Sequence, residues 1–174
     1  GNIMGMDVYG NNPNNETGEY FRANVWWWRP LADYCLSVAP DVCSNCEHWH
    51  SNDGDGLDES SSALLAEALR EEISEGRTAL FEKKYDAEIA AMPLEECKWC
   101  HGTGTRSDSV GQSNGMTDKV IDEPDHPRNG QKGWCNGCKG RGEKEQWAAS
   151  YPFSAEFVGD FAEFVANSGG FKIC

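Results

Sequence analysis

Apolar residues recur at helical spacing between residues 58 and 76. The positions that share one face of this segment are Leu64, Leu65, Leu69 and Ile73. Asp58, Ser60 and Ser61 are candidate N-caps, because short polar side chains satisfy the first free backbone N–H groups of a helix. Gly76 is expected to end the helix.

A second helix is predicted to follow almost at once, from Thr78 to Ala91. The residues expected on its buried face are Leu80, Phe81, Tyr85 and Ile89. Pro93 marks its end, since proline disfavours helical backbone in the residue before it. Two helices joined by so short a connection are predicted to form an antiparallel hairpin.

A third helical pattern lies near the end of the chain. Its apolar positions are Phe157, Val158, Phe161, Phe164 and Val165. Ser154 is the expected N-cap, and the pair Gly169-Gly170 is a typical helix terminator. Residues 171–174 are expected to form a short closing strand.

The N-terminal region gives no clear period. A polar stretch, residues 10–18, precedes a dense aromatic patch at residues 20–34 in which strand and helix cannot be told apart. Gly1-Asn2-Ile3 is interpreted as a remnant of expression, with Met4 or Met6 as the expected start.

These patterns together predict one small α+β domain. Its expected parts are an aromatic N-terminal segment with the helical hairpin (1–96), an inserted zinc-knuckle module (97–142), and a C-terminal helix and strand (143–174) that pack on residues 1–96. The middle of the module, from Arg106 to Gly133, is polar and is predicted to be a loop that its two ends tether. Shortening that loop between Ser107 and Lys132 is expected to leave metal binding intact.

The two ends of the module carry the same motif, CxxCxGxG, at residues 97–104 and 135–142. Each CxxC turn directs two thiolates at one ion, and the glycines let the backbone turn sharply beneath the sulfur atoms. The predicted ligands are Cys97, Cys100, Cys135 and Cys138. Four soft thiolates favour one Zn²⁺ in a structural role. A pair of reduced, metal-free turns or a redox dithiol is the alternative.

This motif resembles the cysteine-rich zinc domain of DnaJ-type chaperones. That family carries four copies for two zinc ions, whereas this chain has two copies, and the resemblance covers about a quarter of it. The chain also lacks the His-Pro-Asp signature of a J-domain, since residues 124–127 read Pro-Asp-His-Pro. The resemblance therefore implies the four ligands and no co-chaperone activity. In general appearance the rest of the chain resembles uncharacterised proteins of phages and prophages.

A candidate second metal site combines Cys43 and Cys46, a third CxxC, with His48 or His50. Cys35 or Cys174 would be its fourth ligand. The alternative is that these cysteines are small buried apolar residues and that the histidines lie in an ordinary loop.

The loop at residues 51–56 superficially resembles a calcium loop, with Asp53 and Asp55 at alternating positions. Ser51 and Ser62 stand where an EF-hand needs acidic ligands, so a turn that leads into the next helix is predicted instead. A metal-dependent hydrolase or nucleotide-binding enzyme centred on residues 43–58 remains the alternative function. No catalytic residue is assigned, because no motif orders these groups.

The run Trp26, Trp27, Trp28 and Arg29 is a candidate interaction surface for a base or a peptide. Successive side chains point in different directions, so at least one of these tryptophans is expected to face the core.

The charge of the chain bears on its partner. It has 29 acidic against 15 basic residues and a net charge of −14, which argues against direct nucleic-acid binding. No apolar stretch is long enough for a membrane span, and the N-terminus shows no signal-peptide pattern, so the cytoplasm is expected. The 8 cysteines, kept reduced there, are then expected to be metal ligands or nucleophiles and not disulfides. We expect a non-enzymatic, zinc-stabilised accessory protein of phage type that binds a host protein, as an anti-defence factor or as a mimic of nucleic-acid charge. The oligomeric state is left open.

Overall fold

The computed structural model describes residues 5–174, so the interpretation of residues 1–3 lies outside the described part of the chain. The chain divides into two compact units. The larger one, called the core unit, takes in the chain up to Ala90 together with Tyr151–Cys174. The smaller one, called the cysteine unit, is Ala91–Ser150. The predicted α+β class is confirmed.

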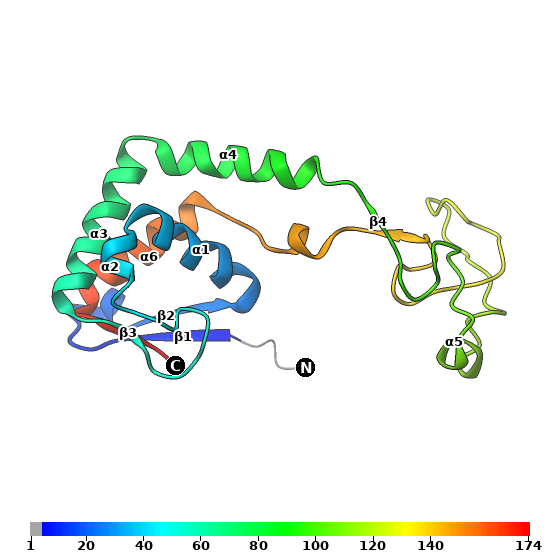
Figure 1. Ribbon diagram of the computed structural model, residues 1–174, viewed down its shortest axis with the longest axis horizontal. Helices are drawn as coiled ribbons and strands as arrows, with labels where there is room; N and C mark the ends of the chain where they lie inside the picture. Colours follow the sequence, from blue (N-terminus) through cyan, green and yellow to red (C-terminus); the bar gives the residue numbers. More distant parts are fainter. Residues whose placement is uncertain (1–4) are drawn as a thin grey trace. The chain divides into compact units, whose positions relative to one another are not determined.

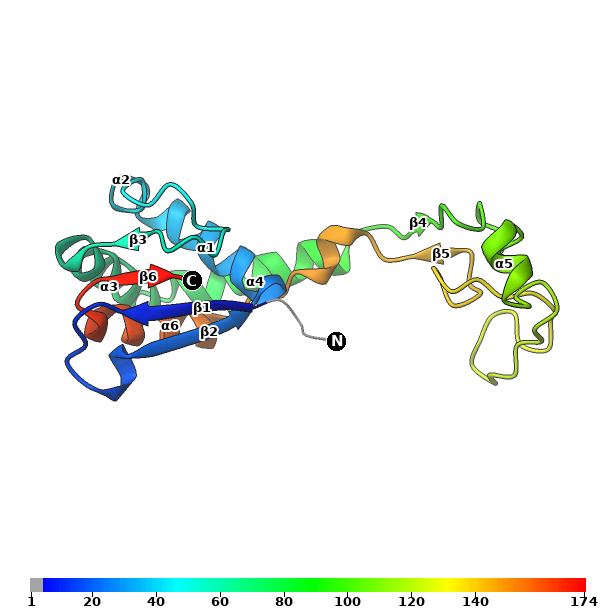
Figure 2. The same ribbon diagram turned by 90° about the horizontal axis from the view of Figure 1, so that it is seen from below.

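An antiparallel sheet with the strand order β2-β1-β6-β3 forms one layer of the core unit. Its strands are β1 (Gly5–Gly10), β2 (Tyr20–Asn24), β3 (Gly56–Leu57) and β6 (Phe171–Ile173). Figure 2 shows β1 lying between β2 and β6. Val8 of β1 pairs with Ile173 of β6, and both side chains are buried. The short closing strand expected at the end of the chain is therefore present.

Helices form the other layer, and Figure 1 shows α1, α3 and α6 on one face of the sheet. The helices of this unit are α1 (Val25–Val38), α2 (Pro40–Cys43), α3 (Glu59–Ser74), α4 (Arg77–Ala90) and α6 (Ala155–Ser168), with a 3-10 turn η1 (Glu16–Gly18). The core between the layers is rich in aromatic rings. Trp28 and Phe161 meet edge to face with centroids 5.6 Å apart, and the Trp28 indole N–H donates to the backbone carbonyl of Trp49.

The helices α3 and α4 and the caps of α3 and α6 form where the sequence pattern predicts, but the predicted antiparallel hairpin is wrong, because Figure 1 shows α4 running across from the end of α3 and not back along it. The Asp58 carboxylate accepts the backbone N–H of Ser61 at the start of α3, and the Ser154 hydroxyl accepts that of Phe157 at the start of α6. The ambiguous aromatic patch becomes strand β2 followed directly by helix α1, with Asn24 as the N-cap between them.

The buried face predicted for the second helix was wrong in part. Leu80 is 66% exposed and Phe81 38%, and Leu64 of α3 is also exposed. In α4 the buried residue is Thr78, whose hydroxyl hydrogen-bonds the Tyr34 hydroxyl. Helix α4 therefore contacts the core through a polar pair and a few ring edges, which a count of apolar residues does not register.

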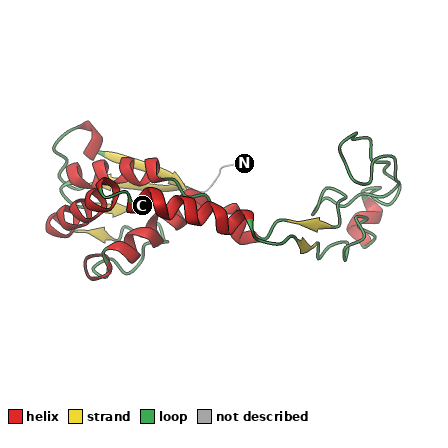
Figure 3. Ribbon diagram, turned by 90° about the horizontal axis from the view of Figure 1, so that it is seen from above, coloured by secondary structure: helices red, strands yellow, loops and turns green. Residues whose placement is uncertain are grey.

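The cysteine unit is mostly loop, as Figure 3 shows. Its short elements are β4 (Glu95–Glu96), α5 (Ser109–Ser113), β5 (Glu143–Lys144) and the 3-10 turn η2 (Trp147–Ser150). The unit is wider than the predicted module at both ends, because β4 and β5 pair antiparallel just outside the two cysteine motifs. The C-terminal segment consequently joins the core unit from Tyr151, and not from residue 143.

Candidate metal centre

The β4–β5 pair brings the two cysteine motifs together. Strand β4 leads directly into the first motif and strand β5 leaves the second, with Glu96 opposite Glu143. The next residue continues the ladder, since the backbone N–H of Cys97 donates to the carbonyl of Gly142 over 2.9 Å. Two segments that are far apart in sequence therefore meet at the cysteines.

Both motifs fold into the same turn. The residue after the second cysteine adopts a left-handed backbone in each, with φ of 52° at His101 and 54° at Lys139. The last glycine of each motif packs against the other motif. A Cβ atom on Gly104 would lie 2.5 Å from the carbonyl oxygen of Gly140, and one on Gly142 would lie 2.4 Å from that of Gly102. The two turns are thus related as near-equivalent halves whose backbones touch.

The four sulfur atoms form one compact cluster. Sγ of Cys97 lies 3.8 Å from Sγ of Cys135, and Sγ of Cys100 lies 3.7 Å from Sγ of Cys138. All four sulfur atoms lie within 4.8 Å of one another. A tetrahedron of sulfurs around an ion with Zn–S bonds of about 2.3 Å has edges of about 3.8 Å. A disulfide needs a separation of about 2.05 Å, and all four cysteines are free.

Backbone N–H groups point at the sulfurs. The N–H of Gly104 donates to Sγ of Cys100 over 3.3 Å, and the N–H of Gly142 donates to Sγ of Cys138 over 3.1 Å. Such bonds stabilise thiolates rather than thiols. The four cysteine residues are each 4% exposed or less, so the cluster offers no open position to a substrate.

Cys97, Cys135 and Cys138 differ in how easily they ionise. Burial opposes ionisation of Cys97, but hydrogen bonds from the backbone N–H groups of Trp99 and Cys100 outweigh it and lower the pKa of Cys97 to about 7. Burial raises the pKa of Cys135 to about 12 and also raises the pKa of Cys138. The Cys97 thiolate therefore forms more easily than those of Cys135 and Cys138, whose ionisation is opposed chiefly by burial. A divalent metal ion removes that penalty, and its affinity depends on pH.

The middle of the module is folded, contrary to the predicted loop. Val120 and Lys132 form an isolated β-bridge, and the side chains of Ile121 and His126 are buried. His126 accepts the backbone N–H of Arg128 at Nδ1, and its Nε2 lies 2.7 Å from the carbonyl oxygen of Lys139 in the second motif. The segment therefore returns to the cysteine motifs and packs on them.

Arg128 joins the two motifs. Its Nη1 donates to the carbonyl oxygens of Gly104 and Gly140, each at 2.9 Å, and reaches that of Gly133 at 3.3 Å. These carbonyls lie on both sides of the cluster, so one guanidinium ties the halves together. Sequence reasoning missed this role. A lone Arg and a lone His in a polar segment form no motif with a recognisable spacing, so the sequence gives no signal for this role.

The predicted second metal site is not brought together. Cys43 and Cys46 are buried in the apolar core, and Sγ of Cys43 contacts the carbonyl of Cys35. His50 pairs with Asp33 at 3.1 Å, and His48 is mostly exposed. Within residues 5–174, the four-cysteine cluster is the single group of three or more potential ligands close enough to share an ion.

Burial also shifts the pKa values of these thiols. It raises the pKa of Cys43 to about 12 and that of Cys46 to about 11, and it raises the pKa of Cys35 well above the usual range. The geometry favours the alternative that these cysteines act as small apolar core residues, since they lie in the apolar core and no group of potential ligands gathers around them within residues 5–174.

The loop at residues 51–56 is organised by Asp55. Its Oδ2 accepts the backbone N–H groups of Glu47 and His48, each over 3.0 Å, and its Oδ1 accepts that of Gly56. Asp53 instead accepts the Ser51 hydroxyl. These carboxylates close a turn that leads into β3 and α3, as the turn interpretation predicts.

The tryptophan run divides between the core and its edge. Trp28 is 1% exposed and lies in the core, so at least one of the three faces inward, as expected. The Trp26 and Tyr151 rings are tilted by 46° with centroids 5.0 Å apart, and Trp27 meets Phe157 with ring centroids 5.5 Å apart. Arg29 is exposed, with its guanidinium carbon 5.6 Å from the Tyr151 centroid. The three indoles therefore do not form one continuous surface.

Comparison with protein-family models, with curated proteins and with solved structures finds no match to this chain. Among the described residues, none of the helices combines the length and the apolar character needed to cross a membrane.

Proposed function

We propose that the four-cysteine cluster holds one Zn²⁺ ion in a purely structural role. Cys97, Cys100, Cys135 and Cys138 would supply all four ligands. The donor set supports this choice, since four thiolates in a tetrahedral arrangement suit Zn²⁺ better than the oxygen-seeking ions Mg²⁺ and Ca²⁺. Bound there, the ion supplies no chemistry beyond fixing the two turns and the segment packed on them.

We propose further that the protein is a binding protein and not an enzyme. The observation that carries this is the closed and buried sulfur shell, which leaves a bound ion no vacant position for water or substrate. The alternative enzyme at residues 43–58 has no support from geometry, because His48, His50 and Asp55 each turn to a different local partner.

The partner that we propose is a basic protein in the cytoplasm of a host cell. The cytoplasm is proposed because cysteine thiols stay reduced there. The distribution of charge supports a basic partner. The core unit holds 20 acidic and 7 basic residues, a net charge of −13, whereas the cysteine unit holds 9 acidic and 8 basic residues. A field of this sign attracts surfaces that otherwise bind nucleic acid. The resemblance to phage proteins is the reason for proposing a host protein and an anti-defence role.

Metal analysis of purified variants tests the structural part of the proposal. Cys97→Ser and Cys138→Ser should each lose the zinc, whereas the control Cys35→Ser should retain one ion per chain, because Cys35 lies in the other unit. Equal zinc contents in all three variants would contradict the assignment. A metal content of zero in the wild-type protein, prepared without chelator, would contradict it as well.

Affinity capture tests the binding role. The zinc-loaded protein, immobilised and exposed to host lysate treated with nuclease, should retain a basic protein in stoichiometric amount. A charge-reversed or denatured bait should not retain it. Recovery of nucleic acid alone from untreated lysate, or turnover of a phosphoester or peptide substrate by the wild-type protein, would overturn the proposal.

A further inference from the structure

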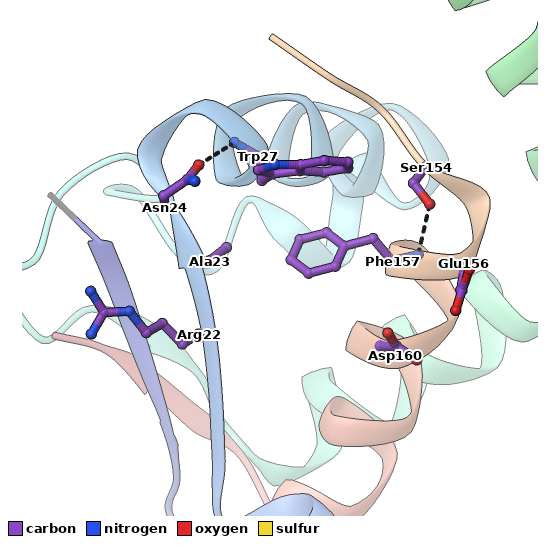
Figure 4. A pocket seen from close by; sticks show the side chains of 8 residues that line it. All are labelled: Arg22, Ala23, Asn24, Trp27, Ser154, Glu156, Phe157 and Asp160. Atoms are coloured by element: carbon purple, nitrogen blue, oxygen red, sulfur yellow. Dashed lines mark hydrogen bonds between the residues drawn. The ribbon is translucent and has the colours of Figure 1, made fainter. Parts of the chain in front are cut away.

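A cavity of about 340 Å³ lies in the core unit where strand β2 and the start of α1 face the first turns of α6. Its volume falls at the small end of the range for ligand sites, enough for one side chain or a small organic ion. It is independent of the cysteine unit, because every residue that lines it belongs to the core unit. Figure 4 shows it from close by.

Two aromatic rings form the apolar wall. Trp27 of α1 and Phe157 of α6 meet with centroids 5.5 Å apart and planes inclined by 60°. In Figure 4 the Phe157 ring points from α6 toward Ala23 on β2, below the Trp27 indole. Both aromatic residues are half-buried, so parts of their π faces remain open to the cavity. Such faces attract organic cations, above all the planar guanidinium group.

Two carboxylates border the same space. Glu156 and Asp160, four positions apart on α6, line the cavity and are exposed. Within residues 5–174 neither carboxylate has a hydrogen-bond or ion-pair partner, which leaves both available to a ligand. The basic residue at the cavity, Arg22, forms an ion pair with Asp7 and extends away from α6 in Figure 4.

The helix N-termini at this cavity would by themselves favour an anion, since each carries about half a positive charge. Three of their free N–H groups are, however, already bonded. Asn24 accepts the N–H of Trp27, Ser154 accepts that of Phe157, and the Glu82 carboxylate accepts that of Ala155. Two full negative charges from Glu156 and Asp160 outweigh what remains of the dipoles. The cavity therefore favours a cation.

We propose that this cavity binds an arginine side chain presented by a basic segment of a partner protein. The guanidinium would stack on Trp27 or Phe157 and donate to the carboxylates of Asp160 and Glu156. Charge complementarity argues for this occupant, because the unit around the cavity has a net charge of −13. This site would specify how the basic partner of the proposed function is recognised, and it rests on that binding role. It can be tested separately from the metal centre.

Titration of the zinc-loaded, ¹⁵N-labelled full-length protein tests the site directly. The probes are three short peptides in which glycine alternates with arginine, lysine or glutamate. The arginine peptide should shift the indole signal of Trp27 and the amide signals of Phe157 and Asp160. The lysine peptide should bind more weakly, because an ammonium group does not stack on an aromatic ring and cannot form a bidentate hydrogen bond with a carboxylate. The glutamate peptide should leave these signals in place.

A charge-matched pair of variants separates the site from the general field of the unit. The double variant Glu156→Gln/Asp160→Asn should weaken binding of the arginine peptide by about three- to tenfold at low salt. The control Asp86→Asn/Glu88→Gln removes the same charge from exposed positions of α4 outside the cavity and should change it by less than about twofold. Trp27→Leu should also weaken binding, because it keeps apolar volume but removes the π face.

Three results would overturn the inference: unchanged signals for Trp27, Phe157 and Asp160, equal loss of affinity in the two double variants, or the same shifts with the glutamate peptide. These results leave the proposed function intact if lysate capture still yields a basic protein. The proposed function falls, and the site stands, if the arginine peptide binds at the cavity but no protein is captured.

Discussion

The core unit buries aromatic and aliphatic side chains between a sheet and several helices, whereas the buried apolar side chains of the cysteine unit are its four cysteines and Ile121. A buried isoleucine contributes about 1.5–3 kcal/mol, and ordering the backbone costs about 1–2 kcal/mol for each residue. Apolar burial therefore accounts for the first unit and not for the second. A structural zinc ion contributes about 10–16 kcal/mol, several times what the buried isoleucine supplies.

Removal of the metal should break this comparison most strongly. A high-affinity chelator is expected to unfold residues 97–142 while leaving the sheet and the helices α3 and α6 folded, because no sulfur ligand lies in the core unit. Hydrogen exchange followed by mass spectrometry measures both units in one sample. Amide protection in the cysteine unit that survives complete metal removal would show that the ion is dispensable for its fold.

A mutation that creates a cavity in the core unit should destabilise that unit and leave the cysteine unit intact. Phe161 is fully buried and contacts the rings of Phe21, Trp28 and Phe171, so Phe161→Ala should lower the free energy of unfolding of the core unit by about 3–5 kcal/mol. Zinc content should stay at one ion per chain. Denaturant unfolding followed by circular dichroism, with metal analysis of the folded protein, checks both parts. Loss of zinc in this variant would mean that the stability of the cysteine unit depends on the folding of the core unit.

Sequence reasoning worked where one local rule decides the structure. Caps such as Asp58 and Ser154 act within one helical turn, and the CxxCxGxG spacing identifies the four clustered cysteines without reference to the rest of the chain. It failed where partners come from elsewhere. Leu80 fits an apolar helical face, yet its side chain is exposed, because α4 contacts the core through Thr78 and a few rings.

The segment between the cysteine motifs shows the same limit in another form. Its hydrogen bonds run from polar side chains to distant backbone carbonyls, and such bonds leave no period in a sequence. Composition alone therefore predicted a loop that could be shortened without effect. With His126 bound to the second motif and Arg128 to both, removal of residues 107–132 is now expected to weaken metal retention.

Arg128 provides a sharper test of how far polar contacts support the metal. Arg128→Met removes a charged donor from three carbonyls. One such hydrogen bond contributes about 1.5–3 kcal/mol, and water replaces part of the lost bonds. We therefore expect the variant to lose about 2 kcal/mol of the free energy of zinc binding. Zinc affinity should fall roughly thirtyfold in competition with a chromophoric chelator. The control Arg141→Met lies within the second motif, but its exposed side chain has no such contacts in the described chain, so affinity should change by less than about threefold.

The smallest expected effect separates backbone strain from close packing at the glycines. Gly142 and Gly130 have nearly equal left-handed conformations, with φ of 86° and 82°, so alanine at either position has a similar conformational cost of about 1 kcal/mol. A Cβ atom at Gly142 would also lie 2.4 Å from the Gly102 carbonyl, whereas one at Gly130 meets nothing within 4 Å. Gly142→Ala should therefore weaken zinc binding by a further factor of about ten relative to Gly130→Ala, measured by the same competition. Equal affinities would show that the two motifs can move apart without loosening the ion, and would place the stability of the unit in the sulfur shell alone.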